Sequence, residues 1–337
     1  MIYPKFIGKG SCIGVTAPSD GNRKETDLIR LESGKRQLER RGYTVIETAD
    51  VRSSVKGRSS DARTRAEELN TLFGNEKVDW VIAAKGGDYL MEILPYVDFD
   101  RIRSNPKWFQ GFSDNTGIDF TITTNCDIAT VYGCNFNDFG MGEWHKAVHD
   151  NLSLLEGRTI IQNSFDYYED SFYDRVTGLE DYRQDKPVYW RNANSDKGVA
   201  LSGRLIGGCL DVLLNLVGTR FDRTADFISK YKADGILWYL ESFALNSDAL
   251  ARGLWQLKEA GWFDCVKGFI FGRPAFFTAM HDISYEEAVL SVLGELDVPV
   301  ILEADIGHKA PQMTMINGAL AGIRSEGGRG TVAFNMK

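Results

Sequence analysis

Cysteine and histidine are both scarce in this chain of 337 residues. The cysteines are odd in number and far apart, and no C-x-x-C spacing occurs; they are Cys12, Cys126, Cys134, Cys209 and Cys265. This usage argues against a disulfide framework and against a zinc site. Of the four histidines, His145 and His149 have an i, i+4 spacing but lack the glutamate of the H-E-x-x-H pattern. We therefore expect no metal and no cofactor, and we interpret these two histidines as surface residues.

The chain also lacks long apolar runs and an excess of basic charge. No stretch of about twenty apolar residues occurs, so no membrane span is expected. With 39 Lys and Arg against 47 Asp and Glu, the net charge is −8, and no basic cluster resembles a nucleic-acid footprint. The first residues contain no basic segment followed by an apolar core, which predicts a cytoplasmic location.

Phosphate-binding loops of the common kinds are missing as well. The first expected strand, residues 11–17, does not lead into G-x-G-x-x-G, which argues against a dinucleotide-binding fold. The paired glycines Gly86 and Gly87 are not followed by the G-K-[ST] of a P-loop. They fit either a tight turn or a stretch of backbone that approaches a ligand closely and lines an oxyanion site.

The length and composition are those of a globular protein with two domains. Hydrophobic residues make up 43% of the chain and charged residues 26%. Up to about residue 132, apolar runs alternate with helical patterns, which predicts an α/β fold with a parallel sheet. The expected strands are 11–17, 43–47, 78–84, 109–112 and 129–132, and the expected helices are 25–41, 61–73, 90–96 and 118–124.

The later part of the chain has a different character. Residues 151–198 are polar, acidic and aromatic, and we interpret them as a crossover that carries a substrate loop. After it we expect helices at 203–217 and 249–260, strands at 235–240, 268–272 and 298–302, and short strands within 319–334. The predicted organisation is an α/β domain over 1–155, an inter-domain crossover over 156–198 and a second domain over 199–337.

The most informative segment runs from Trp108 to Gly117. A short apolar run ends near Gly111, Ser113 follows two residues later, and a helix begins after it. This is the layout of the G-x-S-x-G nucleophile elbow, with Asn115 in place of the second glycine. A serine there lies beside the backbone N–H groups of the helix start, which can hold a developing oxyanion. The alternative is that Ser113 or its neighbour Asp114 only caps the helix.

Two more residues follow apolar strands in the second half. Glu241 comes directly after 235–240, and His308 comes shortly after 298–302. A serine nucleophile needs a base within hydrogen-bond reach, and a histidine base needs a carboxylate that fixes its tautomer. The chain order serine, acid, histidine occurs in known triads. The alternatives are a solvated acid for Glu241 and a surface or loop-packing role for His308.

Taken in order, these segments resemble the LD-carboxypeptidase family of serine peptidases, which includes the microcin-immunity-type carboxypeptidases. The resemblance covers most of the chain and rests on GSCIGVTAPS (10–19), AKGGD (84–88), GFSD (111–114), GRLIGG (203–208), LE (240–241), DIGH (305–308) and PQMT (311–314). It implies a flavodoxin-like N-terminal domain that carries Ser113 and a smaller, β-rich C-terminal domain that carries Glu241 and His308. It also implies a catalytic site between the domains and a homodimer.

The activity implied by the resemblance is metal-free hydrolysis of an amide-type bond near a carboxyl terminus. His308, oriented by Glu241, would take the proton of Ser113, which attacks the scissile carbonyl. The oxyanion would be held by the backbone N–H of Asp114 and by that of Gly86 or Gly87. LD-carboxypeptidases cut a bond from an L- to a D-amino acid in murein peptides, and immunity-type members cut the link between an aspartyl or peptidyl carboxyl and a modified nucleotide.

The length and the long insert before Gly203 resemble the immunity-type members, so an aminoacyl- or peptidyl-nucleotide is the expected substrate. Trp190, in that insert, is expected either to stack on a base or to pack the loop onto its domain. We expect Arg273 to contact the substrate. Two departures from the family's pattern are Cys209, where asparagine is frequent, and Ala275, where immunity-type members often carry an acid.

Rival functions stay open at this point. One is an LD-carboxypeptidase that removes terminal D-alanine from murein tetrapeptides. Another, of a different class, is a non-catalytic binding protein for muropeptides or nucleotide analogues, although the intact set of Ser113, Glu241 and His308 argues against it. A thiol enzyme that uses Cys134 or Cys209 is supported only by nearby glycines. Reaction of Ser113 with a fluorophosphonate distinguishes an enzyme from a binding protein.

Overall fold

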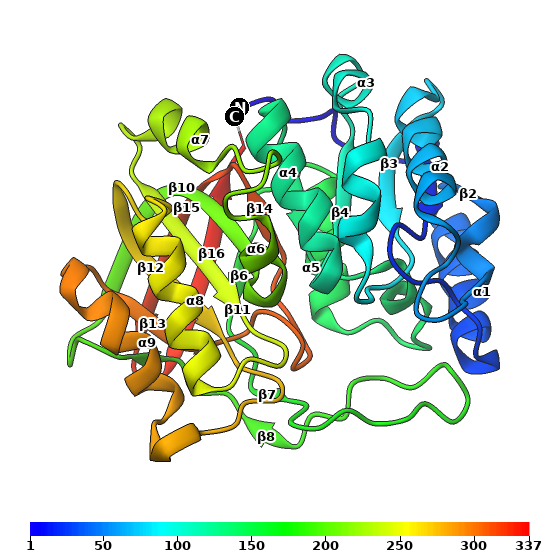
Figure 1. Ribbon diagram of the computed structural model, residues 1–337. Helices are drawn as coiled ribbons and strands as arrows, with labels where there is room; N and C mark the ends of the chain where they lie inside the picture. The colour runs from blue at the N-terminus through cyan, green and yellow to red at the C-terminus, as the bar shows by residue number, and fades with distance from the viewer. Residues whose placement is uncertain (337) are drawn as a thin grey trace. The chain divides into compact units, whose positions relative to one another are not determined.

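The computed structural model describes residues 1–336 and divides into two compact units (Figure 1). Unit 1 consists of Met1–Arg158, Tyr173–Tyr182 and Thr314–Asn317. Unit 2 consists of Thr159–Phe172, Arg183–Met313 and the chain from Gly318 onward. The stretch predicted as a crossover therefore contributes residues to both units. No helix within residues 1–336 is long and apolar enough to cross a membrane.

Unit 1 is built on a six-stranded sheet with the order β14-β5-β4-β3-β1-β2. The five strands β1 to β5 are parallel to their neighbours, and β14 pairs antiparallel with β5. The order 2-1-3-4-5 is that of flavodoxin-like sheets, which confirms the predicted parallel α/β arrangement. The strands are β1 (Cys12–Thr16), β2 (Thr44–Glu47), β3 (Val78–Ala83), β4 (Trp108–Gly111), β5 (Thr130–Tyr132) and β14 (Met315–Asn317).

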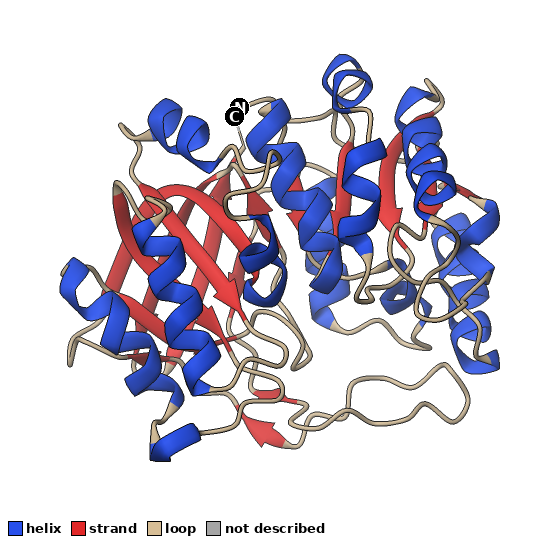
Figure 2. Ribbon diagram, in the orientation of Figure 1, coloured by secondary structure: helices blue, strands red, loops and turns tan. Residues whose placement is uncertain are grey.

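The helices of unit 1 alternate with its strands, as Figure 2 shows by colour. They are α1 (Glu25–Arg40), α2 (Ala62–Gly74), α3 (Phe99–Ser104), α4 (Thr116–Cys126) and α5 (Lys146–Leu155), with the 3₁₀ helices η1 (Ala49–Arg52), η2 (Leu90–Tyr96), η3 (Ser113–Asn115) and η4 (Phe136–Gly140). Asp61 caps α2, because its carboxylate accepts the backbone N–H groups of Arg63 and Thr64. Strand β3 is buried along almost its whole length, as expected for a parallel strand covered on both faces.

Unit 2 is built on an eight-stranded sheet with the order β6-β16-β15-β10-β11-β12-β13-β9. The four central strands β10 to β13 are parallel, and the outer strands pair antiparallel. The strands are β6 (Ile161–Asn163), β9 (Arg191–Asn192), β10 (Val199–Cys209), β11 (Ile236–Glu241), β12 (Val266–Gly272), β13 (Val300–Ala304), β15 (Leu320–Glu326) and β16 (Arg329–Asn335), and β7 (Tyr167–Tyr168) with β8 (Lys186–Pro187) forms a separate ribbon.

One secondary-structure prediction in unit 2 is wrong. Residues from Gly203 were expected to begin a helix, but they form the long strand β10, and the helix α6 (Leu210–Leu216) begins only after it. The reason is that Leu205 and Ile206 are buried between two strand neighbours, β15 and β11, far away in the sequence. A short apolar run has no period that separates a buried strand from a buried helix.

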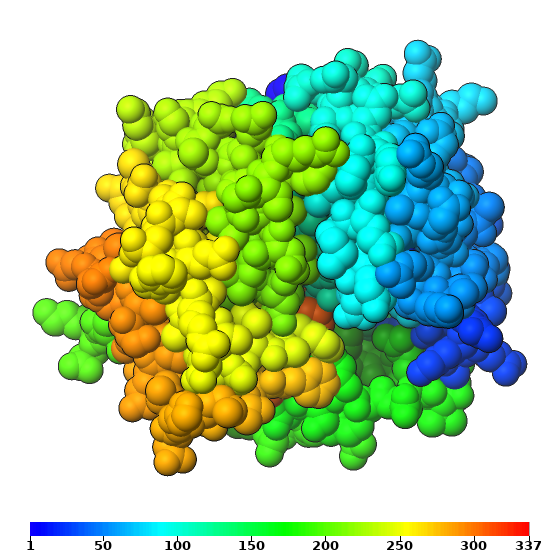
Figure 3. All heavy atoms as spheres, in the orientation of Figure 1, coloured from blue at the N-terminus to red at the C-terminus, as the bar shows by residue number. Residues whose placement is uncertain are grey.

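The other helices of unit 2 are α7 (Thr224–Tyr231), α8 (Ser247–Glu259) and α9 (Tyr285–Leu293), with η5 (Met280–Asp282) and η6 (Gly294–Leu296). Helix α8 packs beside α9, and the two form a continuous yellow and orange surface in Figure 3. Ligands of parallel sheets sit at the carboxyl ends of the strands. In unit 1 this edge carries the loops after β1, β3 and β4, and in unit 2 it carries the loops after β11, β12 and β13.

Candidate active site

Ser113 stands on a strained turn directly after β4. Its φ angle is +65°, in the left-handed region that residues with a side chain rarely adopt. Such strain is typical of functional turns, and the strand–serine–helix geometry matches a nucleophile elbow. The backbone N–H of Ser113 faces the hydroxyl of Tyr132 at 3.3 Å. The capping alternative is not what the structure shows, because α4 has Asn115 at its N-cap and no side-chain cap hydrogen bond.

The side-chain amides of Asn115 and Asn135 stabilise the turn that carries Ser113. The Asn115 amide donates to the carbonyl oxygen of Lys85 at 3.1 Å and to that of Phe112 at 3.1 Å. It also donates to the Asn135 side-chain oxygen at 3.1 Å, and that oxygen accepts the backbone N–H of Phe112. Asn115, which replaces the second glycine of the elbow pattern, therefore ties the loop after β3 to the serine turn.

The glycine pair after β3 lies against the serine. A Cβ built on Gly86 would be 3.0 Å from Ser113 Cβ and 3.1 Å from Ser113 Oγ, so a side chain at this position would crowd the serine. The backbone N–H groups of Gly86 and Gly87 donate to no acceptor among residues 1–336. Unpaired N–H groups beside a serine hydroxyl are what an oxyanion site requires.

In unit 2 the structure brings Glu241 and His308 together. His308 Nδ1 lies 2.9 Å from Glu241 Oε2, with Glu241 fully buried and the His308 side chain 7% exposed. Glu241 ends β11, and His308 follows β13, so two separate strand ends deliver the pair. A buried carboxylate at Nδ1 fixes the orientation of the ring and favours the tautomer with its proton on Nδ1.

The position of the Glu241 carboxylate requires a residue without a side chain next to His308. Gly307 has a φ of +93°, and a Cβ there would be 2.6 Å from Glu241 Oε2. Only glycine adopts this backbone without strain, and only glycine leaves room for the carboxylate. The glycine that precedes the histidine therefore leaves the space that the Glu241 carboxylate occupies.

Cys209 is the strand neighbour of Glu241 in the register between β10 and β11. Its thiol is buried and lies 3.7 Å from a carboxylate oxygen of Asp211. Burial and the nearby carboxylates of Glu241 and Asp211 raise the pKa of the Cys209 thiol well above its usual value. Burial does the same to the pKa of Cys134. Both thiols stay protonated, which argues against the thiol-enzyme alternative.

Three phenylalanines of unit 2 form a cluster that contacts the histidine through Phe243. Phe243 lies 4.7 Å from the His308 ring, centroid to centroid, and 5.1 Å from Phe276 in an edge-on contact. Phe172 stacks on Phe276 at 4.9 Å. Phe172 and Phe276 are each about half exposed, at 50% and 53%. The site therefore presents flat aromatic surface to solvent next to the histidine.

Trp190 and Arg273, predicted to contact the substrate, instead meet at one buried carboxylate. Trp190 Nε1 donates to Asp305 Oδ2 at 3.0 Å, and Arg273 Nη2 lies 2.7 Å from Asp305 Oδ1. Trp190 is 1% exposed and lies against Gly330, so its ring offers no open face for a base. The packing alternative for Trp190 is the one that the structure shows. The guanidinium of Arg273 is 2% exposed, covers the ring of Tyr168, and lines a hollow of about 360 Å³.

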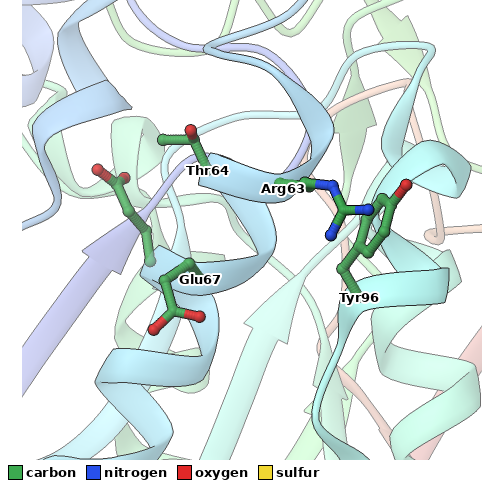
Figure 4. Close-up of a pocket in the computed structure, with 5 residues that line it drawn as sticks. Arg63, Thr64, Glu67 and Tyr96 are labelled. Atoms are coloured by element: carbon green, nitrogen blue, oxygen red, sulfur yellow. The ribbon is translucent and has the colours of Figure 1, made fainter.

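Another hollow, of about 510 Å³, lies on unit 1 between α2 and the end of η2 (Figure 4). Arg63 covers the ring of Tyr96 there, with 4.3 Å from the guanidinium carbon to the ring centroid. The other lining residues are Thr64, Glu67 and Glu68. None of the predicted site residues lines this hollow.

The structure thus groups the candidate residues in two sets. Ser113, Asp114 and Gly86 belong to unit 1, and Glu241 and His308 belong to unit 2. The supporting residues were not predicted from the sequence; they are Asn115 as a brace, Asn135, Tyr132, Gly307 and the phenylalanines 172, 243 and 276. Their contacts join positions that are distant in the sequence, which explains why no local pattern marks them.

Comparison with known families covers both units. Residues 13–133 match the N-terminal domain of the LD-carboxypeptidase family. Residues 202–323 match the C-terminal domain of the same family. The two matched segments together exceed half of the chain and contain Ser113, Glu241 and His308.

Curated relatives align over nearly the whole chain. A protein of Vibrio cholerae that bears a carboxypeptidase name is 27% identical over 99% of this chain and 96% of its own length. The microcin C7 self-immunity protein MccF of Escherichia coli is 25% identical, with coverages of 85% and 83%. A probable murein peptide carboxypeptidase of Bacillus subtilis is 24% identical, with coverages of 96% and 91%.

Solved structures show the same fold. An MccF-like protein from Bacillus anthracis superimposes with a TM-score of 0.82, at 23% identity and 99% coverage of both chains. MccF in complex with aspartyl sulfamoyl adenosine superimposes with a TM-score of 0.80, at 21% identity, over 100% of this chain and 99% of that one. At these identities the likeness concerns the fold alone.

Proposed function

The chain belongs to the LD-carboxypeptidase family, and on that premise we propose that it is a serine-type carboxypeptidase or amidase acting on peptidyl- or aminoacyl-nucleotides. Ser113 is the proposed nucleophile, His308 the base and Glu241 the residue that orients it. The observation that carries the proposal is the left-handed turn of Ser113 at the carboxyl end of β4. A strained non-glycine residue there is costly, and a nucleophile elbow accounts for it.

The proposed reaction begins when His308 Nε2 takes the proton of the Ser113 hydroxyl. Ser113 Oγ attacks the scissile carbonyl, and the backbone N–H groups of Asp114, Gly86 and Gly87 hold the resulting oxyanion. His308 then protonates the leaving group, and water hydrolyses the acyl-enzyme by the same path. Throughout, the buried carboxylate of Glu241 stabilises the charged imidazole.

The nucleotide part of the proposal is supported by the aromatic surface beside His308. Phe172 and Phe276 are half exposed and stacked on each other, and a flat base is a suitable partner for such rings. The fold neighbour MccF, solved with aspartyl sulfamoyl adenosine, has a ligand of this chemical class. Trp190, which is buried, has no part in this surface.

The departures at Cys209 and Ala275 bear on which acyl group is accepted. Cys209 fills the strand position beside Glu241 with a small, protonated thiol. Ala275 places a methyl group between Arg273-Pro274 and Phe276, on a loop whose backbone bonds to Ser242 and Phe243. We propose that the contacts made to the acyl group at these two positions therefore differ from those of the immunity-type members.

A second candidate is removal of D-alanine from murein tetrapeptides. It is favoured by the relative from Bacillus subtilis, a probable murein peptide carboxypeptidase that aligns over 96% of this chain. A terminal D-alanine has no flat group that could stack on the aromatic surface beside His308. We therefore rank this candidate second.

The test is mass spectrometry of two parallel digests with the purified protein and its Ser113→Ala variant. One substrate is aspartyl sulfamoyl adenosine, and the other is a murein tetrapeptide that ends in D-alanine. We expect release of aspartate from the nucleoside by the wild type and no release by the variant. Loss of D-alanine alone would establish the second candidate. Equal cleavage by a folded Ser113→Ala protein would rule out the serine mechanism.

A further inference from the structure

The Asp114 side chain, next to Ser113, joins three loops of unit 1. Strands β1, β3 and β4 are consecutive in the sheet, so the loops that follow them meet at one edge. A single oxygen of Asp114, Oδ2, accepts the Ser19 hydroxyl at 2.5 Å and the backbone N–H of Leu90 at 2.8 Å. Ser19 belongs to the loop after β1, and Leu90 begins η2 after β3. With 5% of Asp114 exposed, these bonds are shielded from water.

Ser19 in turn lies against the glycine pair. A Cβ built on Gly87 would be 2.3 Å from Ser19 Oγ and 3.1 Å from Asp20 Cβ. A Cβ built on Gly86 would be 3.1 Å from Ser113 Oγ. The two glycines are therefore held between the serine turn and the Ser19 hydroxyl, and the position of that hydroxyl is set by Asp114.

A second brace supports the same loops. Arg65, buried in α2, donates from Nη1 to the carbonyl oxygens of Pro18 at 2.9 Å and Tyr89 at 3.1 Å. Burial raises the pKa of the Asp114 carboxyl, as does the nearby Asp88, whereas Ser19, Leu90 and Arg65 lower it. The carboxyl is thus surrounded by donors that fix its orientation rather than by solvent.

We propose that the Asp114 side chain is a positioning residue that, through Ser19, holds the backbone N–H groups of Gly86 and Gly87 at the oxyanion position beside Ser113 Oγ. This inference rests on the proposed serine mechanism, and it concerns the carboxyl group, not the Asp114 backbone N–H. The carboxylate oxygen Oδ2 accepts hydrogen bonds from Ser19 and Leu90. Its effect is transmitted by two hydrogen bonds and one backbone contact.

The test measures phosphonylation of the full-length protein by a fluorophosphonate probe, resolved into the maximal rate, kinact, and the probe affinity, KI. The variants are Ser19→Ala, Asp114→Ala and Asp114→Asn. The control is Ser284→Ala, which removes an exposed hydroxyl–carboxylate bond to Glu287 at the start of α9 in unit 2. Circular dichroism confirms that each variant is folded at the assay temperature.

For Ser19→Ala and Asp114→Ala we expect kinact to fall up to about 100-fold, since small displacements of oxyanion donors act on the transition state. KI should stay within about twofold, because ground-state binding does not use these donors. Asp114→Asn retains an acceptor oxygen and should recover most of the rate. Ser284→Ala should match the wild type.

The inference is overturned if Ser19→Ala retains the wild-type kinact, or if the folded Asp114→Asn and Asp114→Ala proteins lose the same rate. A change confined to KI would also contradict it. Failure of the proposed function has a different signature, namely no labelling of the wild type or undiminished labelling of Ser113→Ala. Ser19→Ala decides the matter even if Asp114→Ala does not fold.

Discussion

Glu241 and His308 form a hydrogen bond at 2.9 Å with the carboxylate fully buried, and single-residue changes at this pair test the mechanism. Glu241→Gln keeps the shape but replaces the carboxylate with an amide that can donate to Nδ1 and select the wrong tautomer. We expect hydrolysis to fall by roughly a thousandfold or more without loss of folding. The digest rates described above measure this. Glu259→Gln, an exposed carboxylate on α8, is the control, and an equal loss there would contradict the assignment.

Gly307→Ala tests the space that the Glu241 carboxylate occupies. The new Cβ would be 2.6 Å from Oε2, so the carboxylate has to move away from His308. We expect hydrolysis to fall at least roughly tenfold in addition to a backbone strain of about 1–2 kcal/mol. The matched control is Gly218→Ala, which has a φ of +76° and open space around the Cβ.

The comparison of these two glycine variants separates strain from displacement. Gly218→Ala should lower the free energy of unfolding by a similar amount and leave the hydrolysis rate unchanged. Urea unfolding and the digest assay measure the two quantities. Equal activity of Gly307→Ala and wild type would show that the carboxylate does not need its observed position.

The 3₁₀ helix η1 is anchored by a carboxyl group that makes stability pH-dependent. Burial, together with the nearby Glu68, raises the pKa of Asp50 to about 7. The folded state therefore binds a proton that the unfolded chain releases near pH 4. Its contribution to stability is present below pH 4 and is lost as the pH rises to about 7.

Asp50→Asn mimics the protonated carboxyl and should flatten this dependence. Between pH 4 and pH 7 the wild type should lose stability that the variant does not lose. The free energy of unfolding of the variant, relative to that of the wild type, should therefore increase over this range. Urea unfolding at several pH values measures it. Asp61→Asn is the control of opposite sign, because hydrogen bonds from Thr64 lower the pKa of the Asp61 carboxyl. A constant difference between Asp50→Asn and wild type would contradict the assignment.

Helices and strands could be predicted from the sequence where the pattern of residues within the element is sufficient to identify it. The alternation of strands and helices up to residue 132 predicts the parallel sheet of unit 1, and the cap of α2 at Asp61 follows from its residue type. Strand β10 was missed, because its identity depends on pairing with β11 and β15. The turn at Ser113 could be read as an elbow or a cap, because its φ angle depends on Asn115 and Asn135, which bond across loops.

The site residues were predictable only as far as their local sequence position indicated a role. Ser113, Glu241 and His308 follow apolar strands and could be singled out by that position. Trp190 was read as a candidate for stacking because it lies in a polar insert, yet its ring and its N–H are both satisfied within unit 2. Tertiary burial of this kind leaves no trace in local sequence.

For the whole molecule, we propose that the chain forms a homodimer, as the family resemblance implies. Light scattering coupled to size exclusion should give about twice the chain mass of 37.7 kDa at micromolar concentration. A mass of one chain at every concentration would contradict the proposal. The same samples of Ser113→Ala should give the same mass, because Ser113 is not proposed to contribute to assembly.

The most direct test of the central claim is peptide mapping by mass spectrometry after exposure to a fluorophosphonate. The serine mechanism predicts that Ser113 alone carries the adduct in the wild type. It also predicts that His308→Ala, with the base removed, acquires the adduct far more slowly while remaining folded. An adduct on another residue, or labelling of Ser113 at an unchanged rate in His308→Ala, would contradict the proposal that His308 activates Ser113.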